Sequence, residues 1–267
     1  MYAKKFFLMM VAASSLLVAQ AQVKTKEQMR AERAAKLQKL KSGEDETSII
    51  FNRQSAFAVR LNTDGYGLFY EHGKYKSLSV TNLWWISLDE YKSPKEERIA
   101  NTDGFFQVGT PFIYGKINNF YQLKVGIGQQ RLIGGKDIKN GVAFSAIYGG
   151  GITAGLLKPY YINAADDSTG ITDDYKYSAQ TDHIFRYGPI NGGSGVGKGL
   201  NEIKFTPGVF ARAALRFDYG AYNELLSALE AGVTAQYYTK EMPVIMDQPG
   251  KKFFFNAYVA LVFGKRK

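Results

Sequence analysis

The stretch PGVFARAALRFDY, residues 207–219, decides the fold of this chain. Apolar side chains occupy every second position from Val209 to Tyr219, and the positions between them include Arg212, Arg216 and Asp218. A period of two indicates a β-strand with one apolar face and one polar face. The segment exceeds the usual length of strands in water-soluble domains, and it is long enough to cross a bilayer at a tilt.

The same alternation recurs along the chain after residue 49, where helix signals almost vanish. We expect eight strands, at residues 54–62, 66–75, 77–91, 118–130, 141–157, 207–219, 224–239 and 252–264. This pattern predicts an all-β fold, an eight-stranded antiparallel transmembrane β-barrel over residues 49–267. Beyond the N-terminal segment, no stretch approaches the ~18 consecutive apolar residues of a membrane-spanning helix.

The connections between the expected strands alternate in length. On one side, the connections at residues 73–77, 131–140 and 220–223 are all short. On the other side, 63–65 is short, whereas 92–117, 158–206 and 240–251 are long. Outer-membrane barrels have short periplasmic turns and long extracellular loops. We therefore place the short turns in the periplasm and the protein in the outer membrane.

The N-terminus has the pattern of a cleaved signal peptide at residues 1–21, with Lys4 and Lys5, an apolar run, and the cleavage motif Ala19-Gln20-Ala21. Residues 22–48 follow as a basic periplasmic helix and linker, the helix itself spanning residues 24–42. Its basic arm is either a solvated leader or a surface that binds anionic lipid or an acidic partner; it includes Arg30, Arg33, Lys36 and Lys39. The chain has no cysteine, which excludes a lipidated-cysteine anchor and disulfides.

Two consecutive stretches carry a resemblance to a known group of proteins. YGKINNFYQLKVGIGQQ (114–130) and NGVAFSAIYGGGITAGLLKPYY (140–161) resemble a recurrent pattern in small, largely uncharacterised outer-membrane β-barrel proteins of Bacteroidota. The resemblance extends over roughly residues 50–264 and implies fold and location, but no activity. One departure is the C-terminus, where Phe263 is followed by Gly-Lys-Arg-Lys instead of ending the chain on an aromatic residue.

The polar faces of the strands predict the contents of the barrel. A small barrel fills its interior with side chains, so we expect Arg212 and Glu230 to form an interior ion pair. A three-residue loop at 220–222 would place these two residues directly opposite each other. Further interior polar residues are expected to be Gln122, Lys124, Arg216, Asp218 and Gln236.

Several motifs resemble functional sites without meeting their requirements. GGSGVGK (192–198) has the spacing of a phosphate loop, but Gly199 stands where Ser or Thr must bind magnesium. The acidic cluster around Asp173 lacks a calcium-ligand register, and neither His72 nor His183 belongs to a convincing catalytic constellation. Glycines within the strands, at 126, 128 and 149–151, indicate close packing. We therefore predict no catalytic residue, metal or cofactor.

These observations favour a protein with a structural, accessory or interaction role. One such role is that of a subunit of a secretion or outer-membrane assembly complex. Its expected partners are outer-membrane lipid, and proteins bound through the extracellular loops or the basic periplasmic helix. Nucleic acid is not expected, despite a net charge of +10, because an exported protein rarely meets it. The alternatives are a lipid-modifying enzyme, and a narrow channel if residues 92–117 or 158–206 contribute further strands to the barrel.

Overall fold

The computed structural model describes residues 51–267, apart from residues 78, 101, 104–105, 108–109, 135–141, 167–169 and 221–223. The expected signal peptide at 1–21 and the expected basic helix within 22–48 therefore lie outside the described residues. Within the described ranges, no helix combines the length and the apolar character that crossing a membrane requires.

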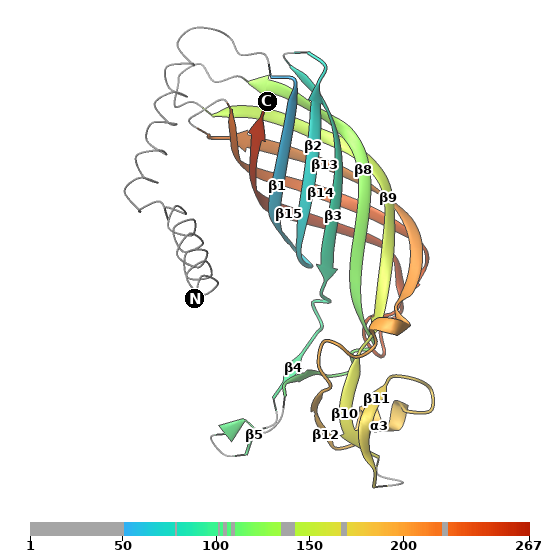
Figure 1. Ribbon diagram of the computed structural model, residues 1–267. Coiled ribbons are helices and arrows are strands. Elements are labelled where there is room, and N and C mark those ends of the chain that lie inside the picture. Colours follow the sequence, from blue (N-terminus) through green and yellow to red (C-terminus); the bar gives the residue numbers. More distant parts are fainter. Residues whose placement is uncertain are drawn as a thin grey trace, which may run out of the picture. The chain divides into compact units, whose positions relative to one another are not determined.

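Eight long strands close into one antiparallel barrel (Figure 1). They are β1 (Arg53–Asn62), β2 (Gly65–Tyr75), β3 (Val80–Tyr91), β8 (Asn118–Gly134), β9 (Ala143–Pro159), β13 (Lys204–Asp218), β14 (Leu225–Met242) and β15 (Lys251–Arg266). Around the barrel the order is β1, β15, β14, β13, β9, β8, β3 and β2, so every strand is paired on both sides. The predicted eight-stranded antiparallel barrel is confirmed, with strand bounds displaced by a few residues.

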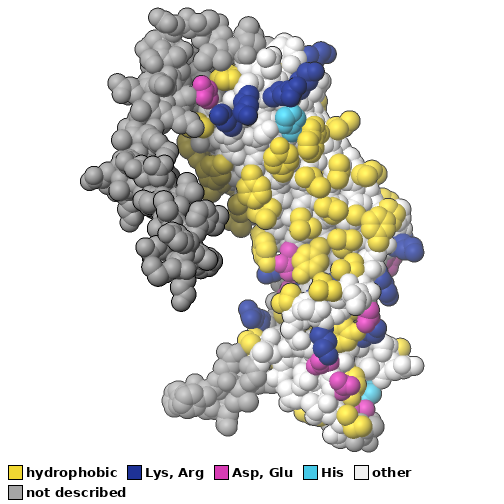
Figure 2. Space-filling model, in the orientation of Figure 1, with side chains coloured by type: hydrophobic (Ala, Val, Ile, Leu, Met, Phe, Trp, Pro, Cys, Tyr) yellow, Lys and Arg dark blue, Asp and Glu magenta, His cyan; other side chains and the backbone are white. Residues whose placement is uncertain are grey.

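The outer wall of the barrel is apolar, and the buried polar and charged side chains of its strands face the interior. In β15, for example, the outward-facing Val259 and Phe263 are each 50% exposed, whereas the inward-facing Asn256 is buried. Figure 2 shows the apolar side chains as a broad yellow band over the middle of the barrel. This distribution is the reverse of that in water-soluble proteins, and it is the distribution of a transmembrane β-barrel.

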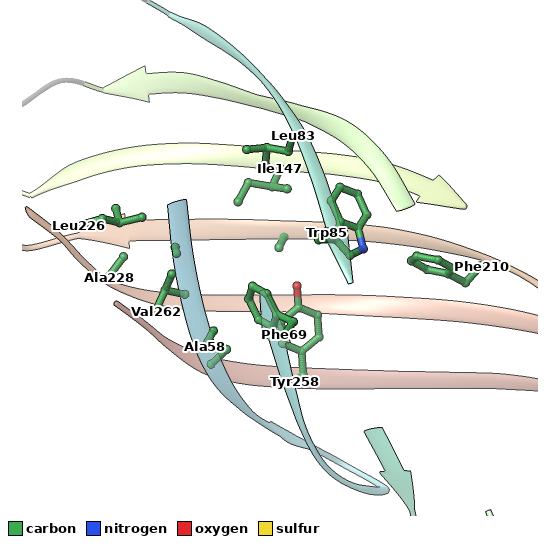
Figure 3. Close-up of a cluster of buried hydrophobic side chains, with 13 residues drawn as sticks. Ala58, Phe69, Leu83, Trp85, Ile147, Phe210, Leu226, Ala228, Tyr258 and Val262 are labelled. Carbon is green, nitrogen blue, oxygen red and sulfur yellow. The ribbon is translucent and has the colours of Figure 1, made fainter. Parts of the chain in front are cut away.

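A buried apolar cluster also lies inside the barrel, and several labelled members are drawn in Figure 3. Trp85 on β3 meets Phe210 on β13 edge-on, with ring centroids 6.3 Å apart. A Cβ added to Gly128 or Gly149 would lie 2.9 or 2.8 Å from Cη2 of Trp85. These glycines therefore make room for the indole, which confirms that the strand glycines serve close packing.

The two rims of the barrel differ in their connections. Residues 76–79, 135–142 and 219–224 form the connections at one rim, which we call the short-turn rim. At the opposite rim, residues 92–117 contain β4 (Arg98–Ile99), β5 (Thr102–Asp103), β6 (Phe106–Gln107) and β7 (Phe112–Ile113). Residues 160–203, which we call the cap, contain β10 (Tyr161–Ala165), β11 (Thr172–Lys176), α3 (Asp182–Tyr187), β12 (Ile190–Gly193) and the 3₁₀ helix η1 (Leu200–Glu202). These short strands form separate small sheets and do not enter the barrel.

The hairpin between β13 and β14 corrects the predicted register. Arg216, not Arg212, lies opposite Glu230, and Arg212 lies opposite Thr234. The expected three-residue loop at 220–222 is wrong, because β13 ends at Asp218 and β14 begins only at Leu225. The residue opposite Arg212 is thus Thr234 instead of the predicted Glu230, a shift of four positions along β14. Because four is an even number, the polar side chains of both strands remain inside the barrel.

The residues after Phe263 continue β15 instead of forming a free tail. Gln54 on β1 pairs with Arg266, and the backbones of Arg53 and Lys267 exchange hydrogen bonds of 2.7 and 2.8 Å. The basic C-terminus is therefore built into the short-turn rim.

Candidate functional site: barrel interior, cap and outer wall

Arg216 lies at the centre of a charged cluster in the barrel interior. Its guanidinium donates to both oxygens of Glu71, at 2.5 and 2.7 Å. It also donates to Oε2 of Glu230 from Nε at 3.0 Å and from Nη2 at 2.6 Å. Because all three side chains are at most 1% exposed, this cluster links β2, β13 and β14 across the lumen.

Arg212, four residues before Arg216 on β13, completes this cluster. Its Nη2 forms an ion pair with Oε1 of Glu230, and its Nε donates to the Tyr258 hydroxyl at 2.7 Å. The same guanidinium lies 4.7 Å from the ring centroid of Phe69 and 5.1 Å from that of Trp85. Aromatic faces attract cations at these distances. Arg212 and Glu230 are therefore paired inside the barrel as expected, although the register between their strands differs.

A second charged cluster links β1, β3 and β8. Both oxygens of Asp89 accept hydrogen bonds from Arg60, the one from its Nε to Oδ1 being 3.1 Å long. The ammonium of Lys124 lies 3.2 Å from Oδ2 of the same carboxylate. Because one anion faces two cations, Asp89 balances one of the two positive charges at this level of the lumen.

Beyond this level, large apolar side chains fill the lumen toward the rim that carries the long loops. Phe120 contacts Tyr91, Tyr238 and Phe254, with ring centroids 5.6, 5.5 and 5.3 Å apart. The rest of this aromatic plug is Leu157, Met242, Val244 and Ile245. Ionic and aromatic layers thus fill the described part of the lumen in succession.

The expected interior residues are all found inside the barrel wall. Gln122, Lys124, Arg216 and Gln236 are each 1% exposed, and Asp218 is 3% exposed. Tyr238 donates to Oε1 of Gln236 at 2.9 Å, and Asp218 pairs with Arg266 near the short-turn rim. The expected basic arm, comprising Arg30, Arg33, Lys36 and Lys39, lies outside the described residues.

The cap has a hydrophobic core of its own and is held by ion pairs. Ile162, Ile184 and Phe185 pack with Met246 from the connection between β14 and β15. Arg186 on α3 donates to both oxygens of Asp247 in that connection, at 2.7 and 2.8 Å. The cap is therefore fastened to a second loop of the same rim.

Other motifs in the cap serve its own structure. Lys198, the last residue of GGSGVGK, forms an ion pair with Asp174. Hydrogen bonds from Lys198 and Asn163 lower the pKa of Asp174 to about 2. The motif begins within the antiparallel strand β12 and precedes a three-residue 3₁₀ helix, so it lacks the parallel strand and the long helix that flank a phosphate loop.

The cap histidine and its acidic neighbours contact different partners. His183 lies 3.5 Å from Asp166, whereas its neighbour Asp182 contacts Arg186 and Tyr177. Among the described residues, no group of three or more His, Asp or Glu side chains is placed to hold a metal ion.

Sequence analysis missed a serine–histidine contact on the outer wall. Ser55 Oγ lies 2.9 Å from Nδ1 of His72, because the hairpin of β1 and β2 places the two residues opposite each other. The His72 ring packs against Trp84, with centroids 5.8 Å apart. The Asn-Thr-Asp-Gly turn at 62–65 contained the necessary signal, since a two-residue loop pairs Asn62 with Gly65 and thereby fixes this register.

Comparisons with known proteins give similarity of form only. No family model matches the chain, and no curated protein matches it. Among solved structures, it is similar to Neisserial surface protein A, with 9% identity, a TM-score of 0.39, and coverage of 80% of this chain and 96% of that one. The N-terminal barrel domain of Pseudomonas aeruginosa OprF gives 9% identity, a TM-score of 0.35, and coverage of 80% and 98%. For Ail of Yersinia pestis the identity is 8%, the TM-score 0.34, and the coverage 82% and 100%. The fold assignment accordingly rests on the strand pairing of this chain.

Proposed function

We propose that this chain is an integral outer-membrane β-barrel protein with a structural or accessory role, in which a closed barrel anchors an external interaction cap. The apolar outer wall supports insertion into lipid, since exposing that wall to water would be unfavourable. The single observation that carries the accessory role is the filled lumen, because a barrel packed with ion pairs and aromatic rings offers solutes no continuous path.

The cap supports the interaction role. It carries well-exposed apolar side chains, including Tyr187 at 81%, Val196 at 82% and Leu200 at 56% exposure. Aromatic and apolar groups of this kind are what protein interfaces bury. Under this proposal the cap, together with the basic segment at 22–48, recruits partners, for example in a secretion or outer-membrane assembly complex.

The two rival functions are less well supported. A narrow channel would need further strands in the barrel wall, and the short strands of residues 92–117 and 160–203 pair elsewhere. A lipid-modifying hydrolase would need an orienting group for His72 and an oxyanion hole. Among the described residues, no carboxylate or amide hydrogen-bonds His72, and the strand N–H groups near Ser55 are committed to barrel pairing.

Reconstitution tests the proposed function directly. The purified protein should insert into liposomes, and the inserted protein should run as a heat-modifiable band on semi-native gels. It should produce no single-channel conductance steps in planar bilayers. Stable conductance would overturn the accessory role, and failure to insert would overturn the membrane location. Lipid A from a deletion strain should be unchanged in mass, since a missing modification would favour the enzyme.

A mild-detergent pulldown with mass spectrometry tests the role of the cap. The matched variant replaces residues 161–202 by a short Gly-Ser linker, which β9 and β13 can accommodate because Leu157 pairs directly with Lys204. This variant should still insert but should lose the partners of the full chain. Equal recovery of partners would show that the cap does not recruit them.

A further inference from the structure

The outer wall changes chemistry within a few residues as it approaches the short-turn rim. The pairing of β1, β2, β3 and β8 aligns outward-facing side chains in rows across the strands. The first row is apolar and consists of Phe57, Tyr70, Ile86 and Val125. The second row is mixed and consists of Ser55, His72, Trp84 and Ile127. The third row is polar and consists of Arg53, Lys74, Asn82 and Gln129. Four residues of strand separate the first row from the third, which is about 13 Å.

A hollow of about 700 Å³ opens in this wall at the level of the second and third rows. Its volume falls within the ~300–1,000 Å³ of small-molecule sites. Ile127 and Trp84, which are 72% and 46% exposed, line its apolar part. Arg53 and Lys74 line it in the third row, and His72 lies beside Trp84 in the second row, so the hollow combines apolar and basic side chains. In Figure 2, dark-blue side chains and a cyan histidine border the upper edge of the yellow band.

Hydrogen bonds fix the shape of the hollow on both sides. Ser55 holds the His72 ring through the contact at Nδ1. On the other side, Gln129 donates to Asn82 at 3.2 Å and accepts from the Tyr148 hydroxyl at 3.0 Å. The side chains that line the hollow are therefore held in position before a ligand binds, and this preorganisation reduces the entropy cost of binding.

We propose that this hollow binds one anionic phospholipid of the inner leaflet. Arg53 and Lys74 hold the phosphate, His72 and Asn82 contact the headgroup, and an acyl chain lies over Trp84 and Ile127. The assignment rests on the proposed function, which places the short-turn rim in the periplasm and hence at a leaflet of phospholipid. The charge argues for this ligand: Arg53 and Lys74 make no salt bridge in the described part of the chain, and an anionic headgroup complements both cations.

Native mass spectrometry of the detergent-refolded full chain tests the site with phosphatidylglycerol and phosphatidylcholine as probes. A cation beside an anionic lipid surface strengthens binding by about fivefold, so Arg53→Gln with Lys74→Gln should lower the retention of phosphatidylglycerol by about 25-fold. The control, Lys240→Gln with Lys252→Gln, removes the same charge from exposed positions at the opposite rim. It should retain phosphatidylglycerol like the parent protein.

Trp84 offers a second readout that reports the acyl chain. Phosphatidylglycerol with brominated acyl chains should quench the exposed Trp84, and Trp84→Phe should lose this quenching because Trp85 is only 1% exposed. The proposed site would be overturned if the protein retained phosphatidylglycerol and phosphatidylcholine equally. It would also be overturned if the control variant lost as much phosphatidylglycerol as the Arg53 and Lys74 variant, or if glycerol phosphate alone displaced the lipid. Heat-modifiable insertion is measured on the same samples, so failure of the site is distinguished from failure of the barrel to insert.

Discussion

Glu230 is the shared acceptor of two interior arginines, and the barrel wall around it excludes water from all three side chains. Buried ion pairs contribute little net stability, but removal of one partner leaves an uncompensated charge, at a cost of about 3–5 kcal/mol. Arg216 keeps its hydrogen bonds to Glu71 if Glu230 is lost, whereas Arg212 has no other carboxylate within hydrogen-bonding distance among the described residues and keeps the Tyr258 hydroxyl and the aromatic faces. Arg212 is therefore the residue that depends most on Glu230.

Glu230→Ala and Arg212→Ala should each lower the temperature at which the folded band unfolds on semi-native gels. The double variant should lose less than the sum of the two, because neither charge is then left without its partner. Glu241→Ala, at an exposed position of the same strand, is the control and should be close to neutral. Strictly additive losses would show that Arg212 and Glu230 do not interact.

At the scale of the strands, glycines on β8 and β9 determine how closely the barrel wall approaches Trp85. A Cβ at Gly149 would lie 2.3 Å from the Ile127 carbonyl oxygen and 2.8 Å from Trp85 Cη2, so neither strand nor indole can accept it without moving. At Gly134, near the end of β8, the nearest atom within 4 Å is Phe144 Cβ at 3.9 Å.

Gly149→Ala should therefore destabilise the barrel by about 1–3 kcal/mol through overpacking. Gly134→Ala should have a much smaller effect, since its added methyl group makes only an ordinary contact. The measurement is the midpoint of urea unfolding in liposomes, followed by the fluorescence of the two tryptophans. Equal midpoints for the two variants would mean that the wall beside Trp85 is not tightly packed.

At the scale of the whole molecule, connection length and the apolar band together define the two sides of the barrel. The long connections and the cap gather at one rim together with the two-residue turn between β1 and β2, and the other rim carries the remaining turns and the C-terminus. In an outer membrane, the rim with long loops faces the exterior. Because the chain contains no cysteine, single introduced thiols report this orientation without background.

Val196→Cys in the cap should react with an impermeant maleimide on intact cells, because that position is 82% exposed. Ser79→Cys, in the turn between β2 and β3, should react only after the outer membrane is permeabilised. Labelling of both variants after permeabilisation is the internal control. The reverse pattern on intact cells would refute the proposed orientation.

The sequence by itself determined the number of barrel strands, the face that each strand turns outward, and the difference between the two rims. These properties follow from a period of two and from connection lengths, which are local. The same period explains the error at the hairpin of β13 and β14: a displacement by an even number of residues leaves Arg212 and Glu230 on their predicted face, so alternation does not select among such registers.

Only the tertiary structure decided which side chains meet across the strands and around the cap. The sharing of Glu230 by Arg212 and Arg216, the packing of Met246 into the cap, and the alignment of Arg53, Lys74 and Asn82 in one row all join segments that are separated in the chain. Their positions depend on register and closure, which are set by the summed packing and hydrogen bonding of the entire barrel rather than by any single segment.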